Sequence, residues 1–255
     1  MRAVILAGGL GTRLRPYTTI IPKPLVPVGE RPILQHIIER LSAAGFRDID
    51  LCVNYLGGLI RAYFNESAEL PESVRLRWHW EDSPLGTAGA LRTIPDLSGS
   101  FIVMNGDILT SLDYRDLYEF HCASDAALTI AMHQKSVNID LGVIECVAGG
   151  VRDYIEKPTL NYDVSMGVYV YDARALSHLP DGECQFPILV QRLIAAGERV
   201  VGYRSDAIWY DIGTMSEYER AISDAALMAT MYQAVDNESG AIDLASANGA
   251  HSVKS

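Results

Sequence analysis

The residues best suited to chemistry stand in the first 31 positions of the 255-residue chain, where five basic residues accompany one acidic residue. In the stretch AGGLGTR, the glycines Gly8, Gly9 and Gly11 allow backbone N–H groups to approach a phosphate, because no side chain intervenes. Arg13 follows them, and Lys23 lies in IPKPLVPV, where the neighbouring prolines stiffen the chain. Glycine N–H groups beside two cations favour a phosphate-binding loop over an ordinary glycine turn.

Two common nucleotide-binding motifs are absent from this loop. No Gly-Lys-Ser/Thr triplet completes a Walker A sequence, and Leu14 occupies the position of the third glycine in the dinucleotide fingerprint. The loop therefore has the composition of a phosphate site without matching either pattern.

The charge of the whole chain contrasts with the charge of its start. The net charge is −11, whereas the first 31 residues carry +4, so the remaining residues carry −15. Nucleic-acid binding needs many Lys and Arg contacts to phosphates, so this balance argues against a nucleic-acid partner and leaves room for a small anionic ligand.

The composition also predicts the cellular setting. No apolar run approaches the length of about 20 residues that a membrane helix needs, and VILAGGL is too short for a secretory signal. Cys52, Cys122, Cys146 and Cys184 are scattered and form no CxxC pair, which predicts reduced core thiols. We therefore expect a soluble cytoplasmic protein with no membrane contact.

The elements that position the loop alternate in the first half of the chain. Residues 3–7 predict a buried strand, RPILQHIIERLSAAG predicts a helix with Pro32 at its first position, and residues 48–54 and 101–107 predict further strands. Strands separated by helices predict parallel pairing with right-handed crossovers.

From about Ala126 onward the pattern changes to strands with few helices between them, which predicts antiparallel pairing. Helices return over residues 186–197 and after Thr214, which forms a capping box with Glu217. We expect a single Rossmann-like α/β domain over residues 1–235, with a mixed, mainly parallel sheet flanked by helices. A small antiparallel region joins it, and residues 236–255 are expected to be a mobile tail.

The motifs together resemble the sugar-phosphate nucleotidylyltransferases, which include glucose-1-phosphate thymidylyltransferases and mannose-1-phosphate guanylyltransferases. GGLGTRLRPYT and PKPLVPV are followed, in the order of that family, by NGD at 105–107, EKP at 156–158 and WYDIGT at 209–214. The resemblance covers roughly residues 1–222. It implies an enzyme that joins a sugar 1-phosphate to a nucleoside triphosphate and releases pyrophosphate.

The resemblance also implies roles for the residues around the triphosphate. Arg13 would neutralise the departing pyrophosphate, and Lys23 would stabilise charge at the α-phosphate. Asp107 ends a predicted buried strand and Asp211 precedes the capped helix, so the two carboxylates could meet at one rim and hold Mg²⁺. The residues implied to bind the nucleotide are Leu6, Ala7, Gly8, Gly9, Gly11, Thr12, Arg13, Gly86, Thr87 and Asp107.

The sugar phosphate is implied to lie against a later part of the chain, the small antiparallel region. There Lys157 would contact its phosphate and Glu156 would accept hydrogen bonds from sugar hydroxyls. Gly142 would present its backbone to the sugar. Ser165 stands near the position where many relatives carry Asn or Thr.

The base is implied to lie against EDSPLGTAGAL, which places Gly86 and Thr87 in a loop before a helix. The PLGTAG form resembles guanylyltransferases acting on mannose or heptose 1-phosphate, which favours GTP. UTP, dTTP, CTP or a non-sugar phosphate acceptor stay open. A non-catalytic regulatory subunit that binds nucleotide sugars is disfavoured, because the charged residues are all present. No six-residue repeat follows the domain, so a homo-oligomer would form through the domain's own surface.

Overall fold

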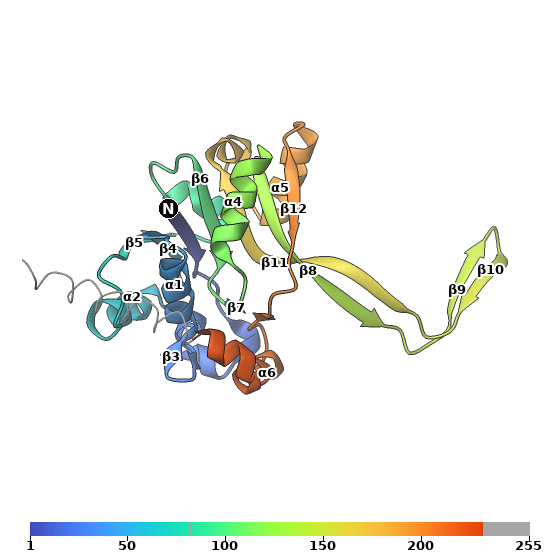
Figure 1. Cartoon of the computed structure of the whole chain (residues 1–255), viewed down its shortest axis with the longest axis horizontal. Coiled ribbons are helices and arrows are strands. Elements are labelled where there is room, and N and C mark those ends of the chain that lie inside the picture. The colour runs from blue at the N-terminus through green and yellow to red at the C-terminus, as the bar shows by residue number, and fades with distance from the viewer. Residues whose placement is uncertain (82, 232–255) are drawn as a thin grey trace, which may run out of the picture.

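The computed structural model of the protein describes residues 1–81 and 83–231. A seven-stranded sheet forms its centre, in the order β12-β8-β11-β6-β1-β4-β5 (Figure 1). Four of its strands are parallel to one another, as the alternating order predicted. They are β1 (Arg2–Leu6), β4 (Asp48–Val53), β5 (Arg75–Trp80) and β6 (Ser100–Asn105).

The remaining strands make the sheet mixed. The long strand β11 runs antiparallel to both β6 and β8, and β12 runs parallel to β8. This arrangement confirms the predicted α/β, Rossmann-like architecture with a mainly parallel sheet. The bounds of these strands are β8 (Leu128–Asn138), β11 (Thr159–Asp172) and β12 (Val200–Arg204).

Three two-stranded sheets lie outside the central one. They are formed by β2 (Pro27–Val28) with β3 (Arg31–Pro32), β7 (Ile108–Thr110) with β13 (Trp209–Asp211), and β9 (Val143–Val147) with β10 (Gly150–Ile155). All three pairs are antiparallel, and β9 with β10 lies within the small antiparallel region predicted for the second half of the chain.

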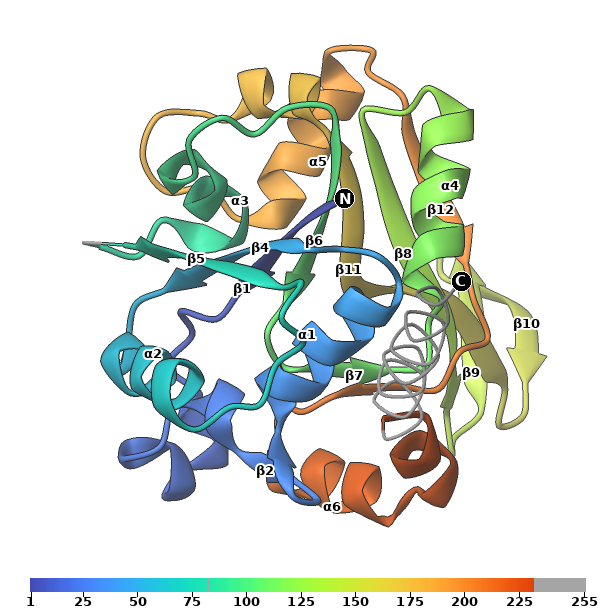
Figure 2. The same ribbon diagram turned by 60° about the vertical axis from the view of Figure 1, so that its left-hand side comes forward.

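Helices cover both faces of the sheet (Figure 2). The α-helices include α1 (Ile33–Ala43), α2 (Gly57–Glu66), α3 (Gly86–Gly89), α4 (Tyr114–Ser124), α5 (Phe186–Ala195) and α6 (Met215–Ser223). Short 3₁₀ helices are η1 (Thr12–Leu14), η2 (Tyr17–Thr19), η3 (Lys23–Leu25), η4 (Ala90–Thr93) and η5 (Ala173–His178). Pro32 has extended ψ of 155° and precedes α1, so its predicted place inside the helix is wrong by one residue.

The core lies on both sides of the sheet because successive residues of a strand point to opposite faces. In β1, Ile5 packs into a cluster with Ile37 and Leu41 of α1, whereas Val4 packs into a second cluster with Leu189 of α5. All five residues are at most 1% exposed. Burial on both faces explains why β1 is a continuous apolar run in the sequence.

Two predictions about composition have different outcomes. Within the described residues, every helix is too short or too polar to cross a lipid bilayer. All four cysteines are free, and Cys52 and Cys184 are buried. Cys122 and Cys146 are exposed, so their predicted place in the core is wrong.

The boundary at residue 235 and the predicted tail over 236–255 lie outside the described residues.

A two-stranded extension projects from the body of the molecule (Figure 1). Beyond a register shift between Ser165 and Tyr169, β8 and β11 continue to pair as far as Asn138 and Thr159, and they carry β9 and β10 at the tip. We call residues 133–165 the arm. A register shift of this kind bends a strand and increases its twist, which explains why the arm leaves the plane of the sheet there.

The predicted capping box begins α6. The Thr214 Oγ1 accepts a hydrogen bond from the Glu217 backbone N–H (3.3 Å), and Glu217 Oε2 accepts one from the Gly213 N–H (3.2 Å). We expect Thr214→Ala to lower the free energy of unfolding by about 1 kcal/mol, which corresponds to roughly 2–4 °C in a thermal melt. Thr214→Ser retains the acceptor and should melt close to the parent. An equal loss in both variants would assign the effect to the lost methyl group.

Candidate active site

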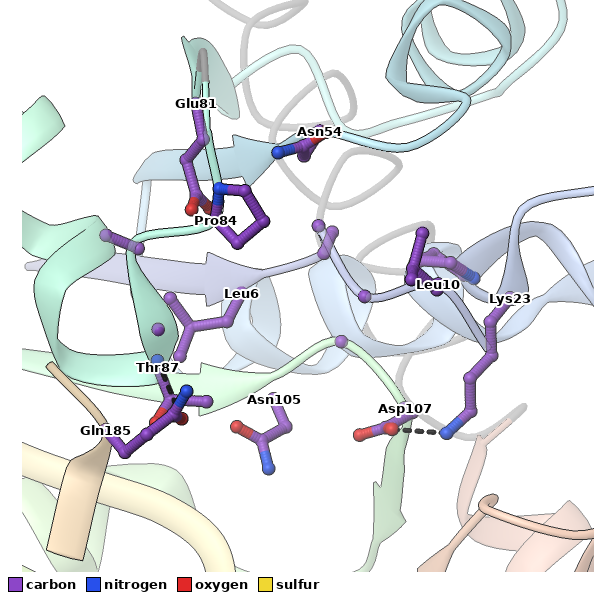
Figure 3. A pocket seen from close by; sticks show the side chains of 17 residues that line it. Leu6, Leu10, Lys23, Asn54, Glu81, Pro84, Thr87, Asn105, Asp107 and Gln185 are labelled. Atoms are coloured by element: carbon purple, nitrogen blue, oxygen red, sulfur yellow. Dashed lines mark hydrogen bonds and ion pairs between the residues drawn. The ribbon is translucent and has the colours of Figure 1, made fainter. Parts of the chain in front are cut away.

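A pocket of about 400 Å³ opens at the carboxyl ends of the parallel strands (Figure 3). Its wall includes residues that closely follow these strands: Gly8 after β1, Asn54 after β4, Glu81 after β5 and Asp107 after β6. Ligands of open α/β sheets bind at this edge, so the pocket is the natural candidate site.

The glycine loop is held against the segment that carries Lys23. Gly11 has φ of +60°, a conformation that favours glycine, and a Cβ there would lie 3.1 Å from Lys23 Cβ. The Thr18 hydroxyl donates a hydrogen bond of 2.7 Å to the Gly11 carbonyl. The two segments recognised separately in the sequence therefore form one unit.

The start of this loop is anchored to the sheet. Leu6, Ala7, Gly8 and Gly9 all line the pocket. The Ala7 N–H donates to the Cys52 carbonyl (2.8 Å), and the Leu6 carbonyl accepts from the Gly106 N–H (2.9 Å). These two backbone groups hold the loop in place. Thr12, which is exposed, begins η1.

Lys23 and Asp107 form an ion pair in the pocket (Figure 3). Lys23 is only 8% exposed, and Pro22 and Pro24 flank it. Its ammonium group contacts Asp107 Oδ2, whereas Asp107 Oδ1 is buried and has no hydrogen-bond partner among the described residues. A buried carboxylate oxygen without a hydrogen-bond partner is suited to bind a cation or to accept a hydrogen bond from a ligand.

Asp211 lies beside Asp107 although the two are far apart in the sequence. It ends β13 and pairs with Ile108 in β7, and the Ile212 N–H donates a 3.0 Å hydrogen bond to the Asp107 carbonyl. Burial raises the pKa of Asp211, and the charge of Asp107 raises it further. The positive charges of Lys23 and Arg13 oppose this effect.

Arg13 completes the group from the exposed side. A Cβ built on Gly213 would lie 3.1 Å from both terminal nitrogens of Arg13, so the guanidinium lies over the turn that follows Asp211. We call Arg13, Lys23, Asp107 and Asp211 the charged cluster. The structure brings all four residues together, as their proposed roles require.

The charged cluster fits a hard divalent cation. Mg²⁺ binds oxygen ligands and in nucleotide sites is held by one or two carboxylates plus phosphates. Asp107 Oδ1 lacks a hydrogen-bond partner among the described residues, and Asp211 lies near the like charge of Asp107. A cation would provide a partner for Oδ1 and would offset the repulsion between the two carboxylates. The described residues contain no group of three or more His, Cys, Asp or Glu suited to a metal. Phosphate and water would have to supply the other ligands.

The predicted base loop is locked to a segment almost 100 residues later. Gly86 has φ of +76°, and a Cβ there would lie 2.6 Å from the Cys184 carbonyl oxygen. The same carbonyl accepts hydrogen bonds from the Ala88 and Gly89 N–H groups (2.9 and 3.0 Å). Thr87 Oγ1 accepts from the Phe186 N–H (2.8 Å). Gly86 and Thr87 line the pocket, but they are the first residues of α3 and do not precede the helix in a loop, as predicted.

Sequence reasoning missed four polar residues of the pocket wall: Asn54, Glu81, Asn105 and Gln185. The first two follow β4 and β5, so the rule that ligands bind at the carboxyl ends of parallel strands could have identified them. Asn105 lies in the NGD triplet already singled out. No local pattern marks Gln185, whose side chain contacts Thr87 across the fold (3.4 Å).

The residues predicted to bind the sugar phosphate all belong to the arm, with Ser165 at its base, where it joins the body. Ser165 hydrogen-bonds Tyr169 (3.2 Å), whose pKa is raised by burial and by the charges of Asp107 and Asp211. Ser165 is therefore near the charged cluster. Glu156 and Lys157 lie near the tip of the arm, which projects from the body of the molecule (Figure 1), and neither lines the pocket.

Gly142 also lies on the arm, where a Cβ would clash with the Tyr154 hydroxyl at 2.0 Å. The structure therefore does not bring Gly142, Glu156 and Lys157 to the pocket, because β8 and β11 carry the tip outward. Their contact with a sugar phosphate stays a prediction.

Comparisons with known proteins identify the family of the chain. The profile of a family described as nucleotidyl transferase matches residues 2–227. Two curated relatives are each 29% identical over 87% of this chain. They are a mannose-1-phosphate guanylyltransferase of Mycobacterium tuberculosis and a UTP–glucose-1-phosphate uridylyltransferase of Synechocystis. The chain covers 64% and 62% of their lengths, respectively.

A solved structure with the same fold is HddC from Yersinia pseudotuberculosis, complexed with GMP-PN. It is 26% identical, with a TM-score of 0.65, and the match covers 87% of this chain and 97% of that one. The family profile covers nearly all of the described residues, including the glycine loop and both aspartates of the charged cluster. The chain belongs to the nucleotidyl transferase family.

Proposed function

We propose that the protein is an enzyme that transfers a nucleotidyl group from a nucleoside triphosphate to a sugar 1-phosphate and releases pyrophosphate. The observation that carries this proposal is the convergence of the charged cluster beside the glycine loop at one edge of the sheet. Two cations and two carboxylates there suit a reaction in which one anion attacks another.

The proposed reaction begins when a phosphate oxygen of the sugar 1-phosphate attacks the α-phosphorus. The bond from that phosphorus to the bridging oxygen breaks, and pyrophosphate leaves with the electron pair. Such a transfer depends on in-line positioning and on stabilising negative charge. Lys23 is buried, so its charge acts in a medium of low dielectric constant, where it stabilises the α-phosphate most strongly. Arg13 lies at the exposed side, where the leaving pyrophosphate can depart.

Asp107 and Asp211 would hold Mg²⁺ in this reaction. When bound, the ion would act as a Lewis acid that offsets negative charge on the phosphates during attack at the α-phosphorus. The Lys23 ammonium group keeps Asp107 oriented by holding its Oδ2, and the buried Oδ1 has no hydrogen-bond partner among the described residues.

The sugar phosphate is proposed to contact Ser165, Gly142, Glu156 and Lys157. Ser165 already lies near the charged cluster through its hydrogen bond to Tyr169. Within one chain, the other three residues can contribute only if the arm bends toward the body. The register shift between Ser165 and Tyr169 is the place where such a bend would occur.

We propose GTP as the nucleotide. Sequence identity to the relatives does not decide which base is bound, because a guanylyltransferase and a uridylyltransferase are equally similar to this chain. The solved relative complexed with GMP-PN supports a guanine nucleotide.

A substrate matrix tests the proposal: GTP, UTP, dTTP, CTP and ATP against a panel of sugar 1-phosphates, with pyrophosphate release as the readout. We expect release with GTP and at least one sugar 1-phosphate, and we expect none when the sugar phosphate is omitted or EDTA is added. If every pair is inactive while nucleotide still binds, the catalytic proposal fails and a regulatory, non-catalytic role gains support.

A further inference from the structure

We propose that the arm of one copy of the chain packs against residues 10–22 of a second copy, so that each pocket of a two-fold dimer is completed by the arm of the other chain. The dimer follows from surfaces that the proposed reaction leaves unexplained. The completion of the pocket rests on the proposed function, because it concerns how Glu156 and Lys157 reach a sugar 1-phosphate.

The shaft of the arm, where β8 pairs with β11, has one polar and one apolar face. The polar face is joined by cross-strand hydrogen bonds of 2.6 and 2.8 Å, in the pairs Ser136–Asn161 and Thr159–Asn138. On the other face Val137 lies opposite Leu160, and Tyr162 is two residues along the strand. These three side chains are between 38% and 53% exposed. An antiparallel ribbon that alternates in this way is suited to cover another surface with its apolar face.

The tip of the arm continues the same pattern. The residues that share one face of β9 and β10 are all hydrophobic: Ile144 opposite Tyr154, and Cys146 opposite Val151. Ile144, Tyr154 and Val151 are between 53% and 69% exposed. A two-stranded ribbon without further cover is only marginally stable in water. The apolar faces of the shaft and the tip therefore call for a surface to pack against.

The body of the same chain does not provide this cover. Among the described residues, every residue of β10 is exposed, and β9 and β10 pair only with each other. Figure 1 shows the tip far from the central sheet. At about 3.3 Å per residue, the shaft and the tip together extend roughly 35 Å. An arm of this length can lie across the surface of a neighbouring molecule.

One surface of the body has matching apolar character. Residues 10–22 join the glycine loop to Lys23 and expose four large apolar side chains, each between 41% and 72% exposed. We call these four residues the N-terminal patch: Leu10, Tyr17, Ile20 and Ile21. Leu10 also lines the pocket, so an arm that covers the N-terminal patch would lie at the mouth of the pocket.

Charge also favours contact between the arm and residues 10–22. The arm contains five acidic and three basic residues, so its net charge is −2, whereas residues 10–22 contain Arg13 and Arg15 and no acidic residue. Complementary charge of this kind favours the correct partner over others. Because both surfaces belong to one chain, a two-fold axis would form the contact twice, once with each arm. A second copy is therefore the partner that these surfaces fit.

The pocket of a single chain is also incomplete for a second anionic substrate. Lys23 is the only Lys or Arg among the described residues that line it, and its ammonium group is already paired with Asp107. Glu156 and Lys157 follow β10 directly, and Glu156 accepts a 3.0 Å hydrogen bond from the Tyr154 hydroxyl on the apolar face of the tip. Docking of that face on the N-terminal patch would bring both charged residues to the neighbouring pocket. There Lys157 can bind the phosphate of the sugar.

The mass of the protein in solution is the first test. At micromolar concentration, sedimentation equilibrium should give about twice the chain mass of 27.9 kDa. Ile144→Asp on the tip and Ile20→Asp in the N-terminal patch each place a charge in the proposed contact. Both should be monomers with parental circular dichroism spectra. Ile194→Asp, at an isoleucine of α5 that is 61% exposed, is the matched control and should remain a dimer.

Mixed dimers test whether the arm acts on the other chain. Lys157→Ala, with an altered arm, and Asp107→Asn, with an altered pocket, are co-expressed with different affinity tags and purified through both. Alone, Lys157→Ala should lose roughly 10-fold or more in kcat/KM for the sugar 1-phosphate. In the mixed dimer one site combines an intact pocket with an intact arm, so about half of the parental kcat/KM per dimer should be present.

The reverse combination is the matched control for the mixed dimer. It pairs the parent chain with a chain that carries both Lys157→Ala and Asp107→Asn, so each site contains one altered part. Its kcat/KM should fall roughly 10-fold or more below that of the parent. If the arm served its own chain, this control would keep about half of the parental activity and the first mixed dimer would stay impaired.

A monomeric parent, or a dimer that persists in either Ile144→Asp or Ile20→Asp, would overturn the docking of the arm. Parental activity of Lys157→Ala, or no recovery in the mixed dimer, would overturn the completion of the pocket by the other chain. If no nucleotide and sugar 1-phosphate yield pyrophosphate, the proposed reaction fails, and the solution masses still decide whether the arm binds a second copy.

Discussion

Asp107→Asn should lower kcat for pyrophosphate release by roughly 1,000-fold or more. The substitution replaces the buried, unpartnered Oδ1 or its companion oxygen with an amide that carries no charge. It also removes the ion pair that holds the Lys23 ammonium group in place. Both effects act on the reacting phosphates, so the loss should appear in kcat at saturating Mg²⁺ and substrates.

The fold should tolerate this change, which makes the test specific. The backbone carbonyl of Asp107, which accepts from the Ile212 N–H, is unaffected by the substitution. Thermal melts of Asp107→Asn and the parent should therefore nearly coincide. Asp206→Asn, at an exposed aspartate outside the charged cluster, is the matched control and should keep full activity. Pyrophosphate release by Asp107→Asn at the parental rate would remove Asp107 from the proposed metal site.

Arg13→Ala should lower kcat by a comparable factor, on the order of 1,000-fold. The guanidinium lies over the turn after Asp211, where its charge can neutralise the leaving pyrophosphate. The KM for the sugar 1-phosphate should change little, because Arg13 is proposed to act on the other reactant. Steady-state kinetics with each substrate varied in turn separates these two parameters.

Two further variants show whether Arg13 acts through its charge and its shape. Arg13→Lys keeps the charge but loses the planar fork of donors, so it should recover only part of the activity. Arg15→Ala removes an exposed arginine two positions along the same loop and should leave kcat within a few-fold of the parent. A lower melting temperature of Arg13→Ala with unchanged kcat would show that Arg13 only supports the fold.

Much of the parallel half of the fold could be predicted, because its signals are local. A strand buried on both faces must be apolar throughout, and residues 3–7 and 101–104 have this composition. The apolar stripe of α1 repeats at helical spacing, and Thr214 and Glu217 stand at the spacing of a capping box. Each of these patterns needs only a few neighbouring residues to be recognised.

Elements with weak local signals were missed or misjudged. Helix α4 buries only Tyr114, Leu117 and His121, so its apolar stripe is too narrow to stand out in the sequence. The pairing of β7 with β13 joins two three-residue strands about 100 residues apart, which no local pattern can reveal. The outward course of the arm depends on continued pairing of β8 with β11, and the sequence does not indicate where that pairing stops.

The sequence by itself determined which chemical groups are present: a glycine loop with two cations, two candidate metal-binding aspartates and a backbone loop for the base. Only the tertiary structure decided that Asp107 and Asp211 are neighbours, that one oxygen of Asp107 lacks a partner, and that Glu81 enters the pocket. Residue types and short spacings specify the local conformation and the chemical groups that are available for a reaction. Contacts between distant segments depend on how the strands of the whole sheet pair and how the helices pack on it. Each such contact results from many weak interactions along the chain.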